Sequence, residues 1–316
     1  MLAAIVQIAL ASVGVLGFRP LSYLSNAQLY LATIVVIVGG QILIALAILK
    51  PKSPLQLVRS KFVEDYQAKL KRGLLLVIAL VVFMPAFSAM KSAIPLFNSY
   101  GWDATLIDLD RLIHGRDAWL ILQPVFGYPF VTFLLAIAYH SWILLIYAGG
   151  VYFAVYEDNR ALALRYFIAY FSIWILGGVC MAIGFASVGP CFASPILGID
   201  TFEGQMTYLQ AANTQYPVLV LDVQQRLLDW HFSGSHGLGR GITAMPSMHV
   251  ALAFLFFLAM RHVSKWAGIA FGAFFVVILI GSVHLAYHYA VDGYVSIILT
   301  ALIWKASGWV LRPAVA

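Results

Sequence analysis

The junction between the last two apolar segments of the chain reads GSVHLAYHYAVDG, residues 281–293. The apolar segments on either side, residues 266–284 and 288–310, each approach the roughly 20 residues that a helix needs to cross a bilayer. Long apolar runs without alternation favour helices over the strands of a barrel. His288 and Asp292 therefore lie in or beside a membrane, where ionisable side chains are costly and usually functional.

The composition supports a membrane protein. Hydrophobic residues make up 62% of the 316 residues and charged residues only 10%, whereas a soluble domain carries roughly 25% charged residues. Outward from residues 281–293, further apolar segments cover residues 29–49, 73–96, 130–156, 162–186 and 247–260, and a shorter one covers residues 2–17. We expect an all-α polytopic membrane protein with about eight spans, the first of them tilted or interfacial.

The charge distribution divides the chain into two parts. Residues 1–72 form an N-terminal two-helix extension that ends in a strongly basic, amphipathic segment, residues 50–72. This segment is predicted to be a cytoplasmic interfacial helix, with a lipid-headgroup patch as the alternative. Residues 73–316 form a six-helix catalytic core, which includes an amphipathic, non-spanning segment at residues 100–123.

The core also contains a long loop, residues 187–245, which we call the cap. An apolar stripe at helical spacing within residues 216–230 predicts either an interfacial lid or a structural helix packed on the spans. If residues 50–72 are cytoplasmic, the basic turns near residues 160–165, 261–265 and 305–312 fall on the same side. The cap and residues 281–293 then face the non-cytoplasmic side, and the compact loops favour a bacterial inner membrane.

Charge and cysteine content exclude other classes of protein. The net charge of +6 comes from basic residues in particular loops, as membrane topology requires, so we expect no nucleic-acid partner. Cys180 and Cys191 lack metal-ligand spacing, and a disulfide between them is left open.

The upstream motif Pro246-Ser247-Met248-His249 begins an apolar segment. Proline is favoured in the first helical turn, whose free N–H groups attract phosphate. Ser247 adds a hydroxyl donor, and His249 is a candidate acid toward a leaving oxygen. An ordinary capped helix explains the same residues equally well.

His288 and Asp292 are four residues apart and would touch on one helical face. A carboxylate on one imidazole nitrogen fixes the tautomer and leaves the other nitrogen as a base or nucleophile. His284 would share this face if the helix were continuous. The alternatives are a structural His–Asp bond and a metal site formed by His284, His288 and Asp292; no acidic cluster supports the latter.

Together, Pro246-Ser247-Met248-His249 and His288-Tyr289-Ala290-Val291-Asp292 resemble the type-2 phosphatidic acid phosphatase superfamily. They are most similar to its inositol phosphorylceramide synthase-like branch, whose motifs read Pro-Ser-x-His and His-Tyr-x-x-Asp. Residues 95–123 resemble the same branch through Trp102-Asp103 and Asp108-Leu109-Asp110-Arg111.

The resemblance implies a six-helix core and a reaction without metal or cofactor. It makes His288 the nucleophile that becomes phosphohistidine, Asp292 its orienting partner and His249 the acid for the leaving group. Ser247 with neighbouring amides would bind the phosphoryl oxygens, and Tyr289 joins the substrate-binding candidates as part of the motif.

The chain departs from the family where positive charge is expected. The family's first motif has a lysine and an Arg-Pro pair, but here Val188-Gly189-Pro190 retains only the proline; Ser282 replaces the third-motif arginine. A transferring phosphoryl group needs positive charge around its oxygens. Arg240 is the first candidate, Arg226 the second and a protonated His284 the third.

We therefore expect a lipid phosphotransferase that moves a phosphorylated head group from a lipid phosphate or phospholipid donor to a lipid or polyol acceptor. The scarcity of cations favours a diester donor over a monoester. A lipid phosphate phosphatase, a transporter using the histidines as a proton relay, and a lipid-binding member without catalysis are the alternatives; a transporter usually shows repeated halves. Asp103, Asp108 and Asp110 form either a solvated face or a polyol site, and the oligomeric state is left open.

Overall fold

A computed structural model describes residues 20–234 and 239–311, and within these residues every regular element is a helix. The prediction of an all-α membrane protein is confirmed, since six of the described helices are long and apolar enough to cross a bilayer. The predicted first segment, residues 2–17, lies outside the described residues. The long helices are α2 (Pro20–Leu49), α4 (Glu64–Ser92), α8 (Pro129–Val151) with η2 (Tyr152–Tyr156), α9 (Arg160–Ile175) with η3 (Leu176–Met181) and α10 (Ala182–Gly184), α15 (Lys265–His284) and α16 (Ala290–Val310).

The predicted span at residues 247–260 is a shorter helix, α14 (Met248–Met260), at the centre of the bundle. It packs against α9, α15 and α16. Most of its side chains are buried, which explains why it is apolar around its whole circumference. Because α14 is enclosed by other helices, its first turn is held in a fixed place within the bundle.

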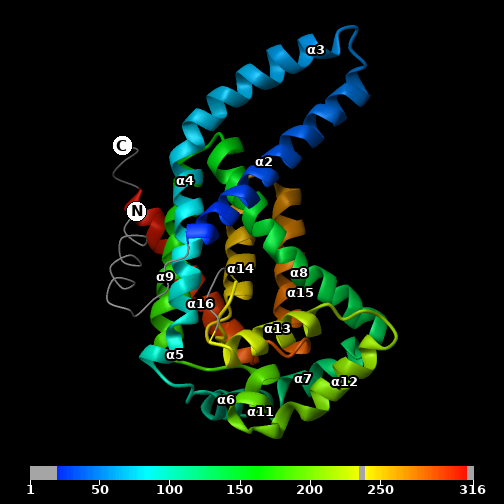
Figure 1. Cartoon of the computed structure of the whole chain (residues 1–316), viewed down its shortest axis with the longest axis vertical. Coiled ribbons are helices and arrows are strands. Elements are labelled where there is room, and N and C mark those ends of the chain that lie inside the picture. The colour runs from blue at the N-terminus through cyan, green and yellow to red at the C-terminus, as the bar shows by residue number, and fades with distance from the viewer. Residues whose placement is uncertain (1–19, 235–238, 312–316) are drawn as a thin grey trace.

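The basic segment at residues 50–72 is continuous with the next long helix and does not form a separate one. α3 (Pro54–Leu57) and η1 (Val58–Val63) lead directly into α4, so that α2 and α4 form a long helical hairpin (Figure 1). Asn26 anchors α2 to the bundle, since its side-chain amide donates to the carbonyl oxygen of Val81 at 2.9 Å and its carbonyl accepts the Tyr147 hydroxyl at 2.9 Å. Polar side chains of this kind hold helices together where no water competes.

A layer of short helices covers the end of the bundle opposite the α2–α3 turn (Figure 1). It contains α6 (Asp103–His114) and α7 (Ala118–Phe126), which follow α5 (Ile94–Phe97). The cap adds α11 (Pro190–Leu197), η4 (Asp200–Phe202), α12 (Glu203–Asn213) and α13 (Val220–Phe232). The predicted amphipathic stripe of the cap is therefore α13, and it lies over the spans.

Hydrogen bonds to the C-terminal end of α15 hold the cap in place. A helix leaves its last carbonyl groups without internal partners. The side-chain amide of Gln205, in α12, donates to the carbonyl of Val283 at 2.7 Å, and that of Gln224, in α13, donates to the carbonyl of Leu285 at 2.9 Å. The cap thus satisfies the carbonyl groups that become free just before His288.

Candidate active site

The α15–α16 connection carries His288, and it is not helical. α15 ends at His284 and α16 begins at Ala290, so the helix is not continuous here, and the condition under which His284 would share a face with His288 and Asp292 is not met. His288 and Asp292 still meet, because Asp292 lies in the first turn of α16 and its Oδ2 is 3.3 Å from Nδ1 of His288. Both side chains are buried. The same Oδ2 accepts the backbone N–H of Tyr289 at 3.1 Å, which fixes the carboxylate beneath the imidazole.

Two aspartates of α6, Asp103 and Asp110, hold the connection between α15 and α16 in place. Asp110 accepts the backbone N–H groups of Ala290 and Val291, each at 2.8 Å. A carboxylate at a helix N-terminus satisfies free N–H groups and interacts favourably with the helix dipole. Burial raises the pKa of the Asp110 carboxyl, and the two backbone hydrogen bonds oppose this rise.

Asp103 joins three separate parts of the chain. It accepts the Tyr289 hydroxyl at 2.7 Å and the backbone N–H groups of Val188 and Gly189 at 3.0 and 2.9 Å. Burial and the neighbouring Asp103 raise the pKa of Tyr289, so its hydroxyl stays protonated and donates. The prediction of a solvated acidic face is correct for exposed Asp108 and wrong for Asp103 and Asp110, whose oxygens bind protein donors.

Gly189 allows the cap to pack closely on the α15–α16 connection, residues 285–289. Gly189 has φ +90°, and a Cβ there would lie 2.5 Å from the carbonyl oxygen of Tyr287. Cys191 then donates its backbone N–H to the carbonyl of Ala286 at 2.8 Å. Cys191 and Cys180 are both free thiols, so they form no disulfide.

His249 faces His288 across a short gap. It lies in the first turn of α14, and its ring stacks on Tyr139 and packs at a tilt against Trp142, with centroid distances of 4.3 and 4.0 Å. The centroids of the His249 and His288 rings are 6.1 Å apart. The three predicted catalytic residues are therefore brought together, although the helix expected to align them is interrupted.

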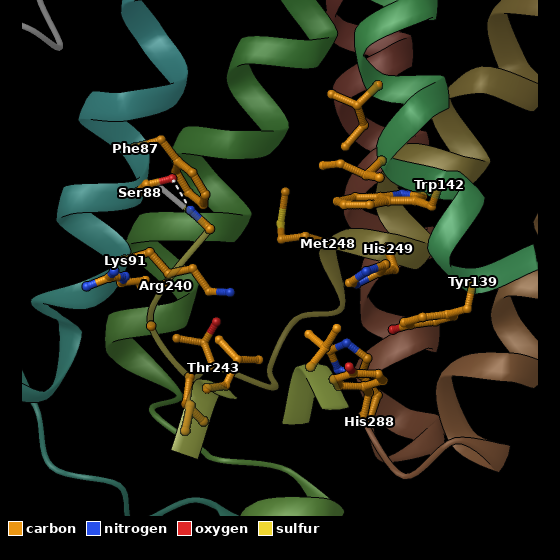
Figure 2. A pocket seen from close by; sticks show the side chains of 18 of the residues that line it. Phe87, Ser88, Lys91, Tyr139, Trp142, Arg240, Thr243, Met248, His249 and His288 are labelled. Atoms are coloured by element: carbon orange, nitrogen blue, oxygen red, sulfur yellow. Dashed lines mark hydrogen bonds between the residues drawn. The ribbon is translucent and has the colours of Figure 1, made fainter. Parts of the chain in front are cut away.

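Both histidines line a cavity of about 310 Å³ (Figure 2). Its walls come from α4, α8, α13 and the loop at residues 239–243. Most lining side chains are apolar, and the polar or charged members besides the histidines include Ser88, Lys91, Tyr139, His140, Arg240, Thr243 and Tyr287. The cavity therefore combines an apolar wall with titratable groups gathered near His249 and His288.

Lys91 is the cation that the sequence analysis missed. It lies in the last turn of α4 and lines the cavity together with the histidines. Its charge acts on His249. The signal was present in the sequence, since a lysine within an otherwise apolar span is unusual and marks a functional site.

Arg240 also lines the cavity, as predicted among the substrate-binding candidates. Its guanidinium carbon lies 4.4 Å from the centre of the Trp230 ring, on α13. The neighbouring Gly241, with φ +95°, packs so closely on α4 that a Cβ would lie 3.0 Å from the Lys91 backbone. Gly239 donates its N–H to the Ser88 hydroxyl at 3.3 Å, so the loop and the end of α4 are held as one unit.

The remaining predicted residues do not line this cavity. Ser247 is the N-cap of α14 and accepts the N–H of Val250 at 3.4 Å, which places Pro246 just before the helix rather than in its first turn. Arg226 is exposed on α13. His284 is buried and hydrogen-bonds Thr132 at 2.9 Å, and the Thr132 hydroxyl contacts that of Tyr208 at 2.7 Å.

No three His, Cys, Asp or Glu side chains gather as metal ligands within residues 20–234 and 239–311. His284 in particular turns toward Thr132 and away from the His288–Asp292 pair. Tyr289 is likewise engaged with Asp103. His284 and Tyr289 thus hold the protein framework around the cavity.

Comparison with protein families gives one match, to a model described as the PAP2 superfamily, over residues 104–306. No curated protein and no solved structure matches the chain. The matched range runs from α6 into α16 and includes His249, His288 and Asp292, whereas α2, α4 and Lys91 precede it. Because the match covers more than half of the 316 residues and includes the motifs that meet at the cavity, the chain belongs to the PAP2 superfamily.

Proposed function

We propose that this protein transfers a phosphorylated head group between lipid carriers through a phosphohistidine at His288. Membership in the PAP2 superfamily supports a phosphatase or phosphotransferase that acts on lipids. The observation that carries the proposal is the His288–Asp292 contact at 3.3 Å, with His249 across the same cavity. This arrangement offers a nucleophile, its orienting carboxylate and an acid in one enclosed space.

The geometry supports a two-step reaction. Asp292 accepts a hydrogen bond from Nδ1–H of His288, which fixes the tautomer and leaves the lone pair of Nε2 to attack phosphorus. A P–N bond forms, the P–O bond to the lipid leaving group breaks, and His249 protonates the departing oxygen. In the second step an acceptor hydroxyl gives its proton to His249 and attacks phosphorus, and the P–N bond breaks. The 6.1 Å between the two ring centroids fits a phosphoryl group between them.

Lys91 and Arg240 supply the positive charge that the family's missing cations would provide. Both line the cavity, one from α4 and one from the loop after α13. A cation in an apolar surrounding interacts with a phosphoryl oxygen far more strongly than it would in water. A phosphodiester has less negative charge than a monoester, so this small set of cations suits a phospholipid donor.

The enclosure of the site favours transfer over hydrolysis. His288 is only 5% exposed, and aromatic side chains surround His249. Excluding water protects a reactive phosphohistidine until an acceptor alcohol arrives. The resemblance of both motifs to the inositol phosphorylceramide synthase-like branch supports the same choice. Hydrolysis of a lipid phosphate is the second candidate, in which water takes the acceptor's place after the same first step.

We place the cavity on the non-cytoplasmic face, in a bacterial inner membrane. The basic segment at residues 50–72 and the cap lie at opposite ends of the bundle, and basic segments remain in the cytoplasm (Figure 1). Single cysteines introduced at Asp158 and at Asp222 in a Cys180→Ser background test this orientation. A membrane-impermeant maleimide added to intact cells should label position 222 and spare position 158; the reverse pattern would contradict the orientation.

The experiment that tests the chemistry is intermediate trapping. Purified protein in vesicles is mixed with phosphatidylinositol carrying a labelled phosphate and quenched in alkali, in which phosphohistidine survives. Label should be bound to the wild-type protein and lost on acid treatment, and the His288→Ala variant should bind none. Label recovered in a new lipid indicates transfer, whereas label in water-soluble inositol phosphate indicates hydrolysis. Undiminished turnover by His288→Ala would overturn the proposal.

A further inference from the structure

The cavity continues past the histidines into the bundle. Along α8 its lining extends from Tyr139 to Tyr147, a path of about 12 Å at the rise of an α-helix. Met84 of α4 and Ile143 and Ile146 of α8 form its inner walls. Within a bilayer this part of the cavity is apolar, while its outer part holds Lys91 and both histidines.

The inner cavity meets the surrounding membrane at Ile143. This side chain lines the cavity and is 45% exposed, whereas Ile146, one turn deeper, lines the same cavity and is 1% exposed. A lipid chain can therefore pass from the bilayer, beside Ile143, to the buried wall at Ile146 without crossing a polar surface. Its head group would then lie at the charged end of the same cavity.

Helix α2 closes the far end. The Tyr147 hydroxyl donates to Asn26 at 2.9 Å, and the Tyr147 ring lies 4.7 Å from the ring of Tyr30. Asn26 and Tyr30 are both fully buried. Beyond Tyr147, a Cβ on Gly150 would lie 2.9 Å from the Leu80 side chain, so no space remains between α4 and α8 at this level.

We propose that one acyl chain of the lipid substrate lies in this inner cavity, and that α2 limits its length by bracing Tyr147. The proposal rests on the proposed function only in requiring a lipid substrate. α2 precedes the matched range of the superfamily, residues 104–306, so this limit is a property of the chain's own N-terminal helix. Asn26 acts as a positioning residue for Tyr147, and Tyr147 contacts the end of the acyl chain.

Photochemical labelling tests the subsite without catalysis. The probe is phosphatidic acid with a diazirine at the methyl end of one acyl chain, in phosphatidylcholine vesicles that contain the His288→Ala protein. Irradiation should attach the probe to peptides containing Met84, Ile146 or Tyr147. Ile146→Trp, which fills the cavity, should abolish this labelling, and Leu144→Trp, on the lipid-facing side of α8, should leave it unchanged. Labelling confined to lipid-facing residues, or unaffected by Ile146→Trp, would overturn the proposal.

Chain-length selectivity tests the role of α2. Dioctanoyl and dioleoyl forms of phosphatidic acid and of phosphatidylinositol are compared by kcat/KM, and by competition against the probe if neither is turned over. Tyr147→Ala and Asn26→Ala should shift the preference toward the longer chain, because the inner cavity then accommodates methylene groups that Tyr147 excludes in the wild-type protein. Leu144→Ala should not shift it. An unchanged preference in Tyr147→Ala would show that α2 sets no limit. Specific labelling of the His288→Ala protein, together with no turnover of any of these lipids by the wild-type protein, would instead refute the phosphotransfer and leave the subsite standing.

Discussion

Asp110 accepts the backbone N–H of Val291 at 2.8 Å, one residue before Asp292. Together with its bond to Ala290, this contact makes α6 the support for the first turn of α16. Asp292 in turn orients His288. The amphipathic helix α6 is thus linked to His288 through the carboxylates of Asp110 and Asp292, each of which accepts hydrogen bonds at the start of α16.

Replacing Asp110 by asparagine should lower kcat with little change in KM. The amide has one oxygen for two backbone N–H groups, so one of them loses its partner and α16 shifts. An unpaired buried N–H costs about 1–3 kcal/mol of stability, and a displacement of catalytic groups by about 1 Å costs roughly 10²-fold in rate. The measurement is kcat per folded molecule, together with thermal unfolding in detergent. Asp108→Asn, on the exposed face of α6, is the matched control and should match wild type; a normal kcat in Asp110→Asn would contradict the support role.

Asp292→Asn should abolish most activity while preserving the fold. Its carboxylate accepts from both the imidazole and the Tyr289 N–H, and an amide can turn its NH₂ toward Nδ1 and impose the wrong tautomer. The loss of a comparable orienting carboxylate costs about 10⁴-fold in other nucleophilic sites. Single-turnover rates of label transfer to His288 provide the measurement. If the intermediate forms at the wild-type rate, Asp292 does not set the tautomer.

Thr132→Val tests whether His284 belongs to the framework or to the substrate site. The substitution keeps the shape of the side chain and removes the hydroxyl that contacts His284 and Tyr208. We expect an unfolding free energy lower by about 1–3 kcal/mol and an unchanged KM, because neither His284 nor Thr132 lines the cavity. His284→Gln should behave in the same way. A raised KM with normal stability in His284→Gln would instead restore His284 as a phosphate ligand.

The sequence was sufficient to predict the six long apolar helices and the meeting of the three candidate catalytic residues. Hydropathy places the starts of α14 and α16 at one end of the bundle, and their motifs name His249, His288 and Asp292. Hydropathy also places the junction between the last two spans, but it could not show how residues 285–289 are held there, because side chains from distant elements fix them. Gln205, Gln224 and Asp110 satisfy the backbone groups that the break between the two helices releases.

Contacts between distant segments also explain why the sequence did not predict which charged side chains are buried or line the cavity. Asp103 and Asp110 follow an amphipathic pattern typical of a solvated helix. They are buried because α6 packs against the connection between α15 and α16. Lys91 reaches the cavity because α4 ends beside the loop at residues 239–243, a contact between segments far apart in the chain. Arg226 lies on α13 beside the cavity-lining Val223 and Leu227, but its own side chain is exposed and does not line the cavity. Sequence spacing gives the face of a helix, and tertiary packing decides what that face meets.

Lys91→Gln should lower kcat/KM by about 10²- to 10³-fold, the usual effect of removing one group that stabilises transition-state charge. The ammonium lines the cavity with His249 and His288, and among residues 20–234 and 239–311 no carboxylate forms an ion pair with it. Its charge is therefore available to a phosphoryl group. Lys91→Arg should retain part of the activity, since it keeps the charge but must fit against Gly241.

Arg226→Gln is the control, because it removes an exposed cation at the same end of the bundle without changing the lining of the cavity. The loss in Lys91→Gln should be larger for a monoester such as phosphatidic acid than for a phosphodiester, because the monoester carries more charge to be neutralised. Equal losses in Lys91→Gln and Arg226→Gln would show that only the overall positive electrostatic potential at this end of the protein matters. Lys91 would then not belong to the site.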